Sequence, residues 1–166
     1  MKKLSLCMIV KNESHIIKEC LESVYPYIDY WVIADNGSTD GTQQLIKDFF
    51  EEKGIPGELH EVEWVDFGHN RTEALNLCDG KAEYCLMIDA DDTIQGKMRI
   101  PKEMKMDGYA LRIQRGDFTW WRTQIFKTGV GWRYTGVLHE YAECPRGEGE
   151  PQMTMERIQG QYFVDA

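Results

Sequence analysis

The sequence predicts an α/β protein with a mostly parallel sheet flanked by helices and a smaller mixed or antiparallel C-terminal part. Over residues 1–95, short apolar runs alternate with helical patterns, which is typical of parallel βαβ units. After Asp92 the pattern changes to two-residue alternation, which favours antiparallel strands. The chain has 166 residues, so we expect a single domain with an ordinary hydrophobic core.

The first half divides into strands and helices in regular order. Apolar residues recur at helical spacing over 16–24, where Pro26 ends the pattern, and again over 45–50. A third helix is expected to start at the polar cluster 70–73. The intervening apolar runs predict buried strands at 4–10, 30–34, 59–65 and 84–88.

Local signals mark two of the element ends. Asp40 precedes the second helix and Gln43 lies three residues later, which predicts a capping box. The stretch 54–57 begins and ends with glycine, so we expect a turn there.

The second half is rich in aromatic residues. Alternating stretches at 109–113 and 117–127 predict antiparallel or mixed strands, and 144–155 is expected to be a loop. Two interpretations stay open for the aromatic residues, a wall that stacks on a sugar or ordinary core packing; the residues are Trp120, Trp121, Trp132 and Tyr134.

Composition excludes several classes of protein. A net charge of −9 argues against binding to nucleic acid or to an anionic membrane, since both need clustered positive charge. The apolar run 6–10 is far shorter than the about 20 residues of a membrane span. The five cysteines contain no C-x-x-C pair, so zinc-ribbon and redox interpretations lack support, and we expect a reducing, cytoplasmic setting.

Several common catalytic motifs are missing from the sequence. It contains no Walker A motif, no G-x-G-x-x-G and no G-x-S-x-G. Phosphate-loop kinases, dinucleotide oxidoreductases and serine hydrolases are therefore not indicated.

The strongest chemical signal is a run of acids after the fourth predicted strand. Asp89, Asp91 and Asp92 fall within four residues, and crowded carboxylates must be protonated or bind a cation. Oxygen ligands favour a hard divalent ion, Mg²⁺ or Mn²⁺, which could join a nucleoside diphosphate to the loop. The alternative is a solvated turn in which Asp92 or Thr93 caps a helix.

Weaker signals lie elsewhere along the chain. Asp35 opens a glycine-containing loop at the end of the second predicted strand, where it could accept hydrogen bonds from a base or ribose, or simply form a turn. Arg71, near a helix start, could neutralise a phosphate or be an ordinary surface residue. Glu140, among aromatic neighbours, could accept a proton or belong to a strand ion pair.

Taken together, these segments resemble the family 2 glycosyltransferases, which have the GT-A (Rossmann-like) fold. The segment 132–140 further resembles a subgroup found ahead of helical repeats in longer chains. The resemblance covers residues 4–144 and is carried by 5–13, 35–42, 66–75, 86–92 and 132–140.

The resemblance implies a nucleotide-sugar site and a catalytic base. It makes Glu140 the general base and makes Asp91, Asp89 and His139 the contacts to Mn²⁺ or Mg²⁺. The expected contacts to the nucleotide sugar are Val10, Asn12, Glu13, Asp35, Asn36, Arg71, Asp89 and Ala90.

The implied activity is metal-dependent and inverting transfer of a sugar. The donor would be a UDP- or GDP-sugar and the acceptor hydroxyl would belong to a glycan, a lipid or a protein. Residues 1–95 would form the nucleotide-binding half, 96–144 the acceptor and catalytic half, and 145–166 a tail. The alternatives are a non-catalytic or truncated domain that binds sugar nucleotides and, less favoured, a nucleotidyltransferase.

Overall fold

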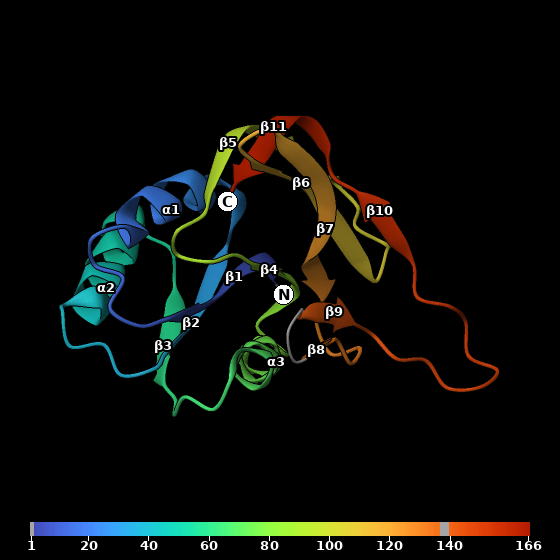
Figure 1. The fold of residues 1–166 in the computed structure, drawn as a ribbon, viewed down its shortest axis with the longest axis horizontal. Helices are drawn as coiled ribbons and strands as arrows, with labels where there is room; N and C mark the ends of the chain where they lie inside the picture. The colour runs from blue at the N-terminus through green and yellow to red at the C-terminus, as the bar shows by residue number, and fades with distance from the viewer. Residues whose placement is uncertain (1, 137–139) are drawn as a thin grey trace.

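The computed structural model describes residues 2–136 and 140–166, which form a large mixed sheet with helices on both faces (Figure 1). The strand order is β3-β2-β1-β4-β7-β6-β11-β5. The first four strands in this order run parallel, which confirms the predicted βαβ half; they are β3 (Gly57–Glu61), β2 (Tyr30–Asp35), β1 (Lys2–Val10) and β4 (Ala82–Met87).

The registers of the parallel strands bring their carboxyl ends to one edge of the sheet. Val10 of β1 lies opposite Asp35 of β2, and Cys7 of β1 lies opposite Met87 of β4. The loops that follow these strands therefore meet at the same edge. In open α/β sheets this edge is where ligands bind, so the fold places the acidic loops at the expected position.

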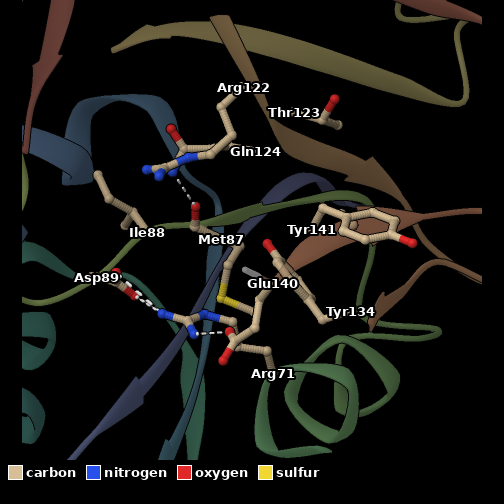
Figure 2. Close-up of a pocket in the computed structure, with 11 residues that line it drawn as sticks. Arg71, Met87, Ile88, Asp89, Arg122, Thr123, Gln124, Tyr134, Glu140 and Tyr141 are labelled. Atoms are coloured by element: carbon tan, nitrogen blue, oxygen red, sulfur yellow. Dashed lines mark hydrogen bonds and ion pairs between the residues drawn. The ribbon is translucent and has the colours of Figure 1, made fainter. Parts of the chain in front are cut away.

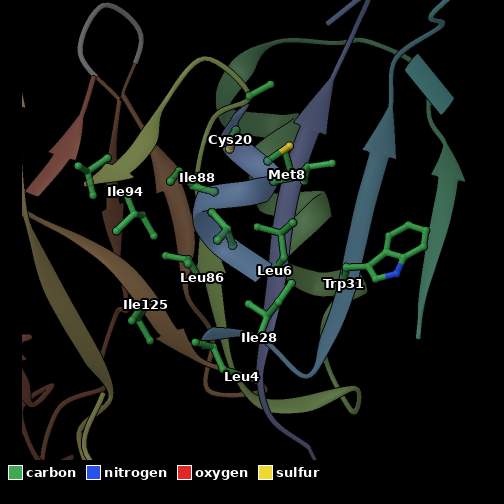
Figure 3. Packing of buried hydrophobic residues seen from close by; sticks show 14 of the residues in the cluster. Leu4, Leu6, Met8, Cys20, Ile28, Trp31, Leu86, Ile88, Ile94 and Ile125 are labelled. Carbon is green, nitrogen blue, oxygen red and sulfur yellow. The ribbon is translucent and has the colours of Figure 1, made fainter. Parts of the chain in front are cut away.

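The helices cover the two faces because successive strand residues point to opposite sides of the sheet. α1 (Ile17–Val24) and α2 (Thr42–Lys53) pack on the face that carries Leu6, as Figure 3 shows for the residues around α1. α3 (Phe67–Leu77) packs on the face that carries Cys7. Pro26 ends the first helical pattern as predicted, within a short 3-10 turn.

The other half of the sheet is mostly antiparallel, as the alternating stretches predicted. β4 pairs antiparallel with β7, β7 with β6, and β11 with β5, while β11 runs parallel to β6. The strands of this half are β7 (Phe118–Lys127), β6 (Gly108–Arg115), β11 (Gln159–Asp165), β5 (Thr93–Arg99) and β10 (Met155–Arg157), the last of which lies along β6. β8 (Arg133–Thr135) and β9 (Tyr141–Glu143) form a separate pair of strands, of which β8 contacts α3.

Three local predictions were wrong. The third helix starts at Phe67 rather than at the 70–73 cluster, because Asp66 caps it by accepting the His69 N–H at 2.7 Å. The third strand covers Gly57–Glu61 rather than 59–65. The capping box does not form, since Gln43 donates its amide to Asp35 instead.

The C-terminal segment contributes more than the sequence indicated. Residues 145–154 form no regular element, but the chain then enters β10 and β11, and β11 lies inside the sheet between β6 and β5. The turn after Asp92 leads into β5 and not into a helix. Tyr162 and Val164 of β11 are buried in the same cluster as Leu6.

In the described residues, no helix is both long and apolar enough to cross a membrane.

Candidate functional site

The loop after β2 is organised around the buried carboxylate of Asp35. Its Oδ2 accepts the N–H groups of Gly37 at 3.0 Å and Ser38 at 2.8 Å, and the Gln43 amide at 2.9 Å. Burial alone would raise the pKa of Asp35, but the hydrogen bonds from Ser38, Gln43 and Gly37 lower it below the usual value. Within the described chain, the buried Oδ1 has no hydrogen-bond partner.

The loop after β1 is hydrogen-bonded to the loop after β2. The Asn12 N–H donates to Ser38 Oγ at 2.8 Å, and Asn12 Oδ1 accepts the Thr39 N–H at 2.8 Å. Asn12 adopts a left-handed conformation with φ +51°, which asparagine tolerates better than most residues. The Glu13 N–H donates to Thr42 Oγ1 at 2.9 Å. Asn12 and Glu13, both predicted to contact the nucleotide, are thus hydrogen-bonded to the segment that follows β2.

The loop after β4 contains the acidic cluster, defined here as Asp89, Asp91 and Asp92. One carboxylate oxygen from each lies within 4.8 Å of the others. Burial, together with the nearby charges of Asp89 and Asp91, raises the pKa of Asp92 to about 7. A set of convergent carboxylate oxygens fits a hard divalent cation such as Mg²⁺ or Mn²⁺. The carboxylates of the acidic cluster therefore fit the divalent ion expected from the sequence.

Arg71 of α3 joins the acidic cluster to the predicted base. Its guanidinium donates to Asp89 Oδ1 at 3.0 Å and to Glu140 Oε2 at 2.7 Å. Burial would lower the pKa of Arg71, but the charges of Asp89 and Glu140 raise it above its usual value. The arginine therefore stays charged and holds two carboxylates that are 51 positions apart in the sequence.

These side chains line a cavity of about 330 Å³ at the carboxyl edge (Figure 2). Arg71, Asp89 and Glu140 lie on one side of it, and Arg122 and Gln124 of β7 lie on the other side in this view. The Gln124 amide donates to the Met87 carbonyl at 2.9 Å, which ties β7 to the end of β4. Residues from α3, β4, β7 and the β8–β9 segment thus converge on one space; Tyr134, Tyr141 and Ala142 complete the wall.

The structure brings most of the predicted site residues together in two places. Arg71, Asp89 and Glu140 line the first cavity, which we call the acidic cavity. A second cavity of about 290 Å³ has Val10, Glu13 and Asn36 in its lining. Of the other predicted residues, Ala90 is buried and Asp91 is exposed, both within the loop after β4, and His139 lies outside the described residues.

Sequence reasoning missed the contribution of β7 and of the segment before α3. Arg122 and Gln124 belong to a short polar run, 122–124, within β7, and no motif distinguishes them. Of the four aromatic residues considered as a sugar wall, Tyr134 lines the acidic cavity and Trp132 is in the core. Trp121 packs against Arg157. The exposed aromatic residues Trp64 and Phe67 line the second cavity, and the sequence analysis gave neither a role, although Phe67 lies in the segment 66–75 that carried the resemblance.

Comparison with known proteins places the chain in a family. Residues 5–137 match the family described as glycosyl transferase family 2. The chain belongs to this family. The matched range includes the β1 and β2 loops, Arg71 and the acidic cluster, so the resemblance inferred from the motifs is confirmed.

Curated relatives of this glycosyl transferase family 2 member are longer proteins. A TPR repeat-containing protein of Synechococcus elongatus is 33% identical over 153 residues, which cover 86% of this chain and 36% of the relative. The lipopolysaccharide core biosynthesis glycosyltransferase LpsC of Rhizobium meliloti is 31% identical over 96 residues, covering 58% and 34%. The chain thus spans about a third of the length of these relatives.

Solved structures share the fold. The crystal structure of S. aureus TarS residues 1–349 superposes with a TM-score of 0.54 and 22% sequence identity, over 70% of this chain and 37% of that one. The likeness confirms the GT-A fold expected from the sequence.

Proposed function

We propose that this chain is the donor-binding and catalytic part of a metal-dependent, inverting glycosyltransferase. It would transfer a sugar from a UDP- or GDP-sugar to a hydroxyl of a glycan, lipid or protein. The observation that carries the proposal is the arrangement around the acidic cavity, where Arg71 links the acidic cluster to Glu140. Family membership supports it, as do the complexes of TarS with UDP and UDP-GlcNAc.

The proposed nucleotide contacts follow the carboxyl edge of the sheet. Those on the nucleoside side are Val10, Asn12, Glu13, Asp35 and Asn36, which lie on the connected β1 and β2 loops. On the diphosphate side they are Arg71, Asp89 and Ala90, beside the acidic cavity. Along this edge, the hydrogen-bonded loops would face the nucleoside, and the charged groups beside the acidic cavity would face the diphosphate.

The acidic cluster is the proposed metal site. Asp91 and Asp89 would hold Mn²⁺ or Mg²⁺, and His139 is proposed as a further contact to the metal or phosphate. When bound, such an ion offsets negative charge on a leaving diphosphate, a contribution of several kcal/mol in metal enzymes generally. Without a cation, a diphosphate beside these carboxylates would be strongly repelled.

The proposed chemistry at the sugar is a single displacement. Glu140 takes the proton of the acceptor hydroxyl while the hydroxyl oxygen forms its bond to C1 of the donor sugar. The bond between C1 and the diphosphate oxygen breaks, and its electron pair stays on that oxygen. Attack from the face opposite the diphosphate inverts the configuration at C1. Arg71 holds Glu140 in position through the 2.7 Å ion pair.

We assign the two halves of the chain different tasks. Residues 1–95 would bind the nucleotide, and 96–144 would supply the base and the acceptor side. The range 145–166, expected as a tail, contains β10 and β11. A reducing, cytoplasmic setting is supported by the five cysteines, all free and buried in the structure.

The test is turnover of UDP- and GDP-sugars with Mn²⁺ and a panel of acceptors. Glu140→Gln should lower transfer by about 100-fold or more, as loss of a general base does. Glu143→Gln is the matched control, because Glu143 lies three residues away and pairs with Arg133 at 3.0 Å. Full activity of Glu140→Gln would contradict the mechanism. Nucleotide binding by the wild type without turnover of any donor would favour the non-catalytic alternative.

A further inference from the structure

Two exposed aromatic residues lie together just before α3 and at its start. Trp64 is 43% exposed and Phe67 is 51% exposed, and their ring centroids are 4.8 Å apart with planes at 83°. Exposed large apolar side chains are ordinary when they are scattered, but a contiguous group marks a binding surface. Val65 between them is 56% exposed, so this segment presents an apolar surface to solvent.

This aromatic pair forms part of the second cavity. The same space is lined by Val10 and Glu13 from the end of β1 and by Asn36 from the end of β2. The lining therefore combines two aromatic rings with residues from the ends of β1 and β2, two of which, Glu13 and Asn36, have polar side chains. Asp35, next to Asn36 in sequence, keeps one buried carboxylate oxygen without a partner in the described chain.

Phe67 connects the second cavity to the acidic cavity. The Arg71 guanidinium lies 5.1 Å from the centre of the Phe67 ring, a cation–π distance, and the same guanidinium pairs with Asp89 at 3.0 Å. Aromatic rings, a cation and the acidic cluster thus follow one another along the edge. A ligand that spans them would need a flat apolar group at one end and anionic groups at the other.

We propose that Trp64 and Phe67 form the stacking wall for the base of the nucleoside diphosphate. The inference rests on the proposed function and adds two residues that determine affinity for the base. Stacking suits a base because its π-face meets a ring while its edge stays free for hydrogen bonds. A nucleobase also explains why the rings adjoin Arg71, since the phosphates attached through its ribose then reach the cation.

A purely structural role for the pair is the competing explanation. Phe67 is the first residue of α3, and its contact with Trp64 could simply stabilise the start of the helix. Such a role would change stability and would weaken all ligands of the site alike. Stacking on a base predicts loss of affinity only for ligands that carry a base.

The test compares UDP with pyrophosphate, which lacks the base, by calorimetry in Mn²⁺. For Trp64→Ala we expect UDP to bind about tenfold more weakly, in the range that loss of one stacked base gives, with pyrophosphate affinity unchanged. Trp64→Phe, which keeps a ring, should restore most of the affinity. Phe118→Ala is the matched control, since Phe118 is 76% exposed and lies outside the linings of both cavities.

The outcomes separate this inference from the proposed function. If Trp64→Ala and the wild type bind UDP equally while transfer persists, the stacking wall is wrong and the glycosyltransferase proposal stands. Equal weakening of UDP and pyrophosphate would assign the pair a structural role and overturn the inference. If the wild type binds neither UDP- nor GDP-sugars, both proposals fall. Should Trp64→Ala not fold, Phe67→Leu supplies the same comparison.

Discussion

The two acidic loops at the carboxyl edge accommodate their charge in opposite ways. In the loop after β2, the buried carboxylate of Asp35 accepts three hydrogen bonds from residues within eight positions of it. In the loop after β4, Asp89 and Asp92 lie beside Asp91, and burial together with the charges of Asp89 and Asp91 raises the pKa of Asp92 to about 7. In the first loop, hydrogen bonds from nearby residues compensate the charge on Asp35 Oδ2. In the second loop, three carboxylates lie together, and they are not compensated in this way.

The difference also shows in what holds each loop. The Asp35 loop is fixed by neighbours in sequence and by the β1 loop. The acidic cluster depends on distant groups: Arg71 contacts Asp89, and β5, which begins directly after Asp92, pairs along its whole length with β11. We infer that the β2 loop provides a rigid surface, while the β4 loop provides a charged site that a cation completes.

Removing one carboxylate from each loop should separate the two roles, with the largest effect at the β4 loop. Asp91→Asn should lower sugar transfer by about 100-fold or more, because the lost metal contribution is several kcal/mol. Its unfolding temperature should not fall, since the change relieves repulsion within the cluster. Asp40→Asn, whose carboxylate accepts hydrogen bonds from Ser14 and Thr42, should lower the unfolding temperature instead. Transfer kinetics and thermal unfolding are measured on both variants. Unchanged sugar transfer by Asp91→Asn would contradict the proposed metal role of the β4 loop.

The dependence of the β4 loop on β11 can be tested through Gly96 of β5. A Cβ on Gly96 would lie 2.1 Å from the Gln161 carbonyl oxygen, and the residue has φ +83°. Gly96→Ala should therefore reduce the free energy of unfolding by about 3 kcal/mol, from combined backbone strain and steric overlap. Gly116→Ala is the control, because Gly116 also has positive φ but no neighbouring atom within 4 Å.

Gly116→Ala should cost only about 1 kcal/mol from backbone strain. Chemical denaturation measures both values. Equal effects in the two glycine variants would mean that the β5–β11 pairing does not constrain the chain as described.

The smallest expected effect concerns pH and the β2 loop. The folded-state pKa of Asp35 is lowered, so the stability it contributes is present above its unfolded pKa of about 3.9 and is lost as pH falls through the folded value. Asp35→Asn should thus reduce the free energy of unfolding by about 1 kcal/mol at pH 7. The deficit should shrink below about pH 4.

Denaturation curves between pH 7 and pH 3 test this dependence. Asp48→Asn, on the exposed side of α2, serves as the control. A deficit for Asp35→Asn that stays constant over this range would contradict the assignment.

The sequence predicted the parallel half of the fold better than the rest. The apolar runs of β1, β2 and β4 are buried through tertiary contacts on both faces, so composition alone identifies them. β5 has only Ile94 and Met98 buried, and it is stabilised by pairing with β11, more than sixty residues later. Such long-range pairing leaves no local pattern, which is why neither strand was predicted.

The residues of the candidate site also fall into two groups, those that the sequence located and those that only the folded structure shows. Asp35 and the acidic cluster could be located because each lies at the carboxyl end of an apolar strand. The contact of Arg71 with Glu140 joins α3 to the segment before β9, and no spacing in the sequence indicates it. Gln124 and the Trp64–Phe67 pair likewise acquire their positions only from the assembled sheet edge.

The claim on which the other proposals depend is that a divalent ion in the acidic cluster attaches a nucleoside diphosphate to the protein. Titration calorimetry of UDP with the 166-residue chain, in Mn²⁺ and again in excess chelator, tests it most directly. We expect UDP to bind at least about tenfold more tightly with Mn²⁺, and Asp91→Asn to abolish that difference. Equal affinity for UDP with and without the ion, in the wild type, would contradict the account.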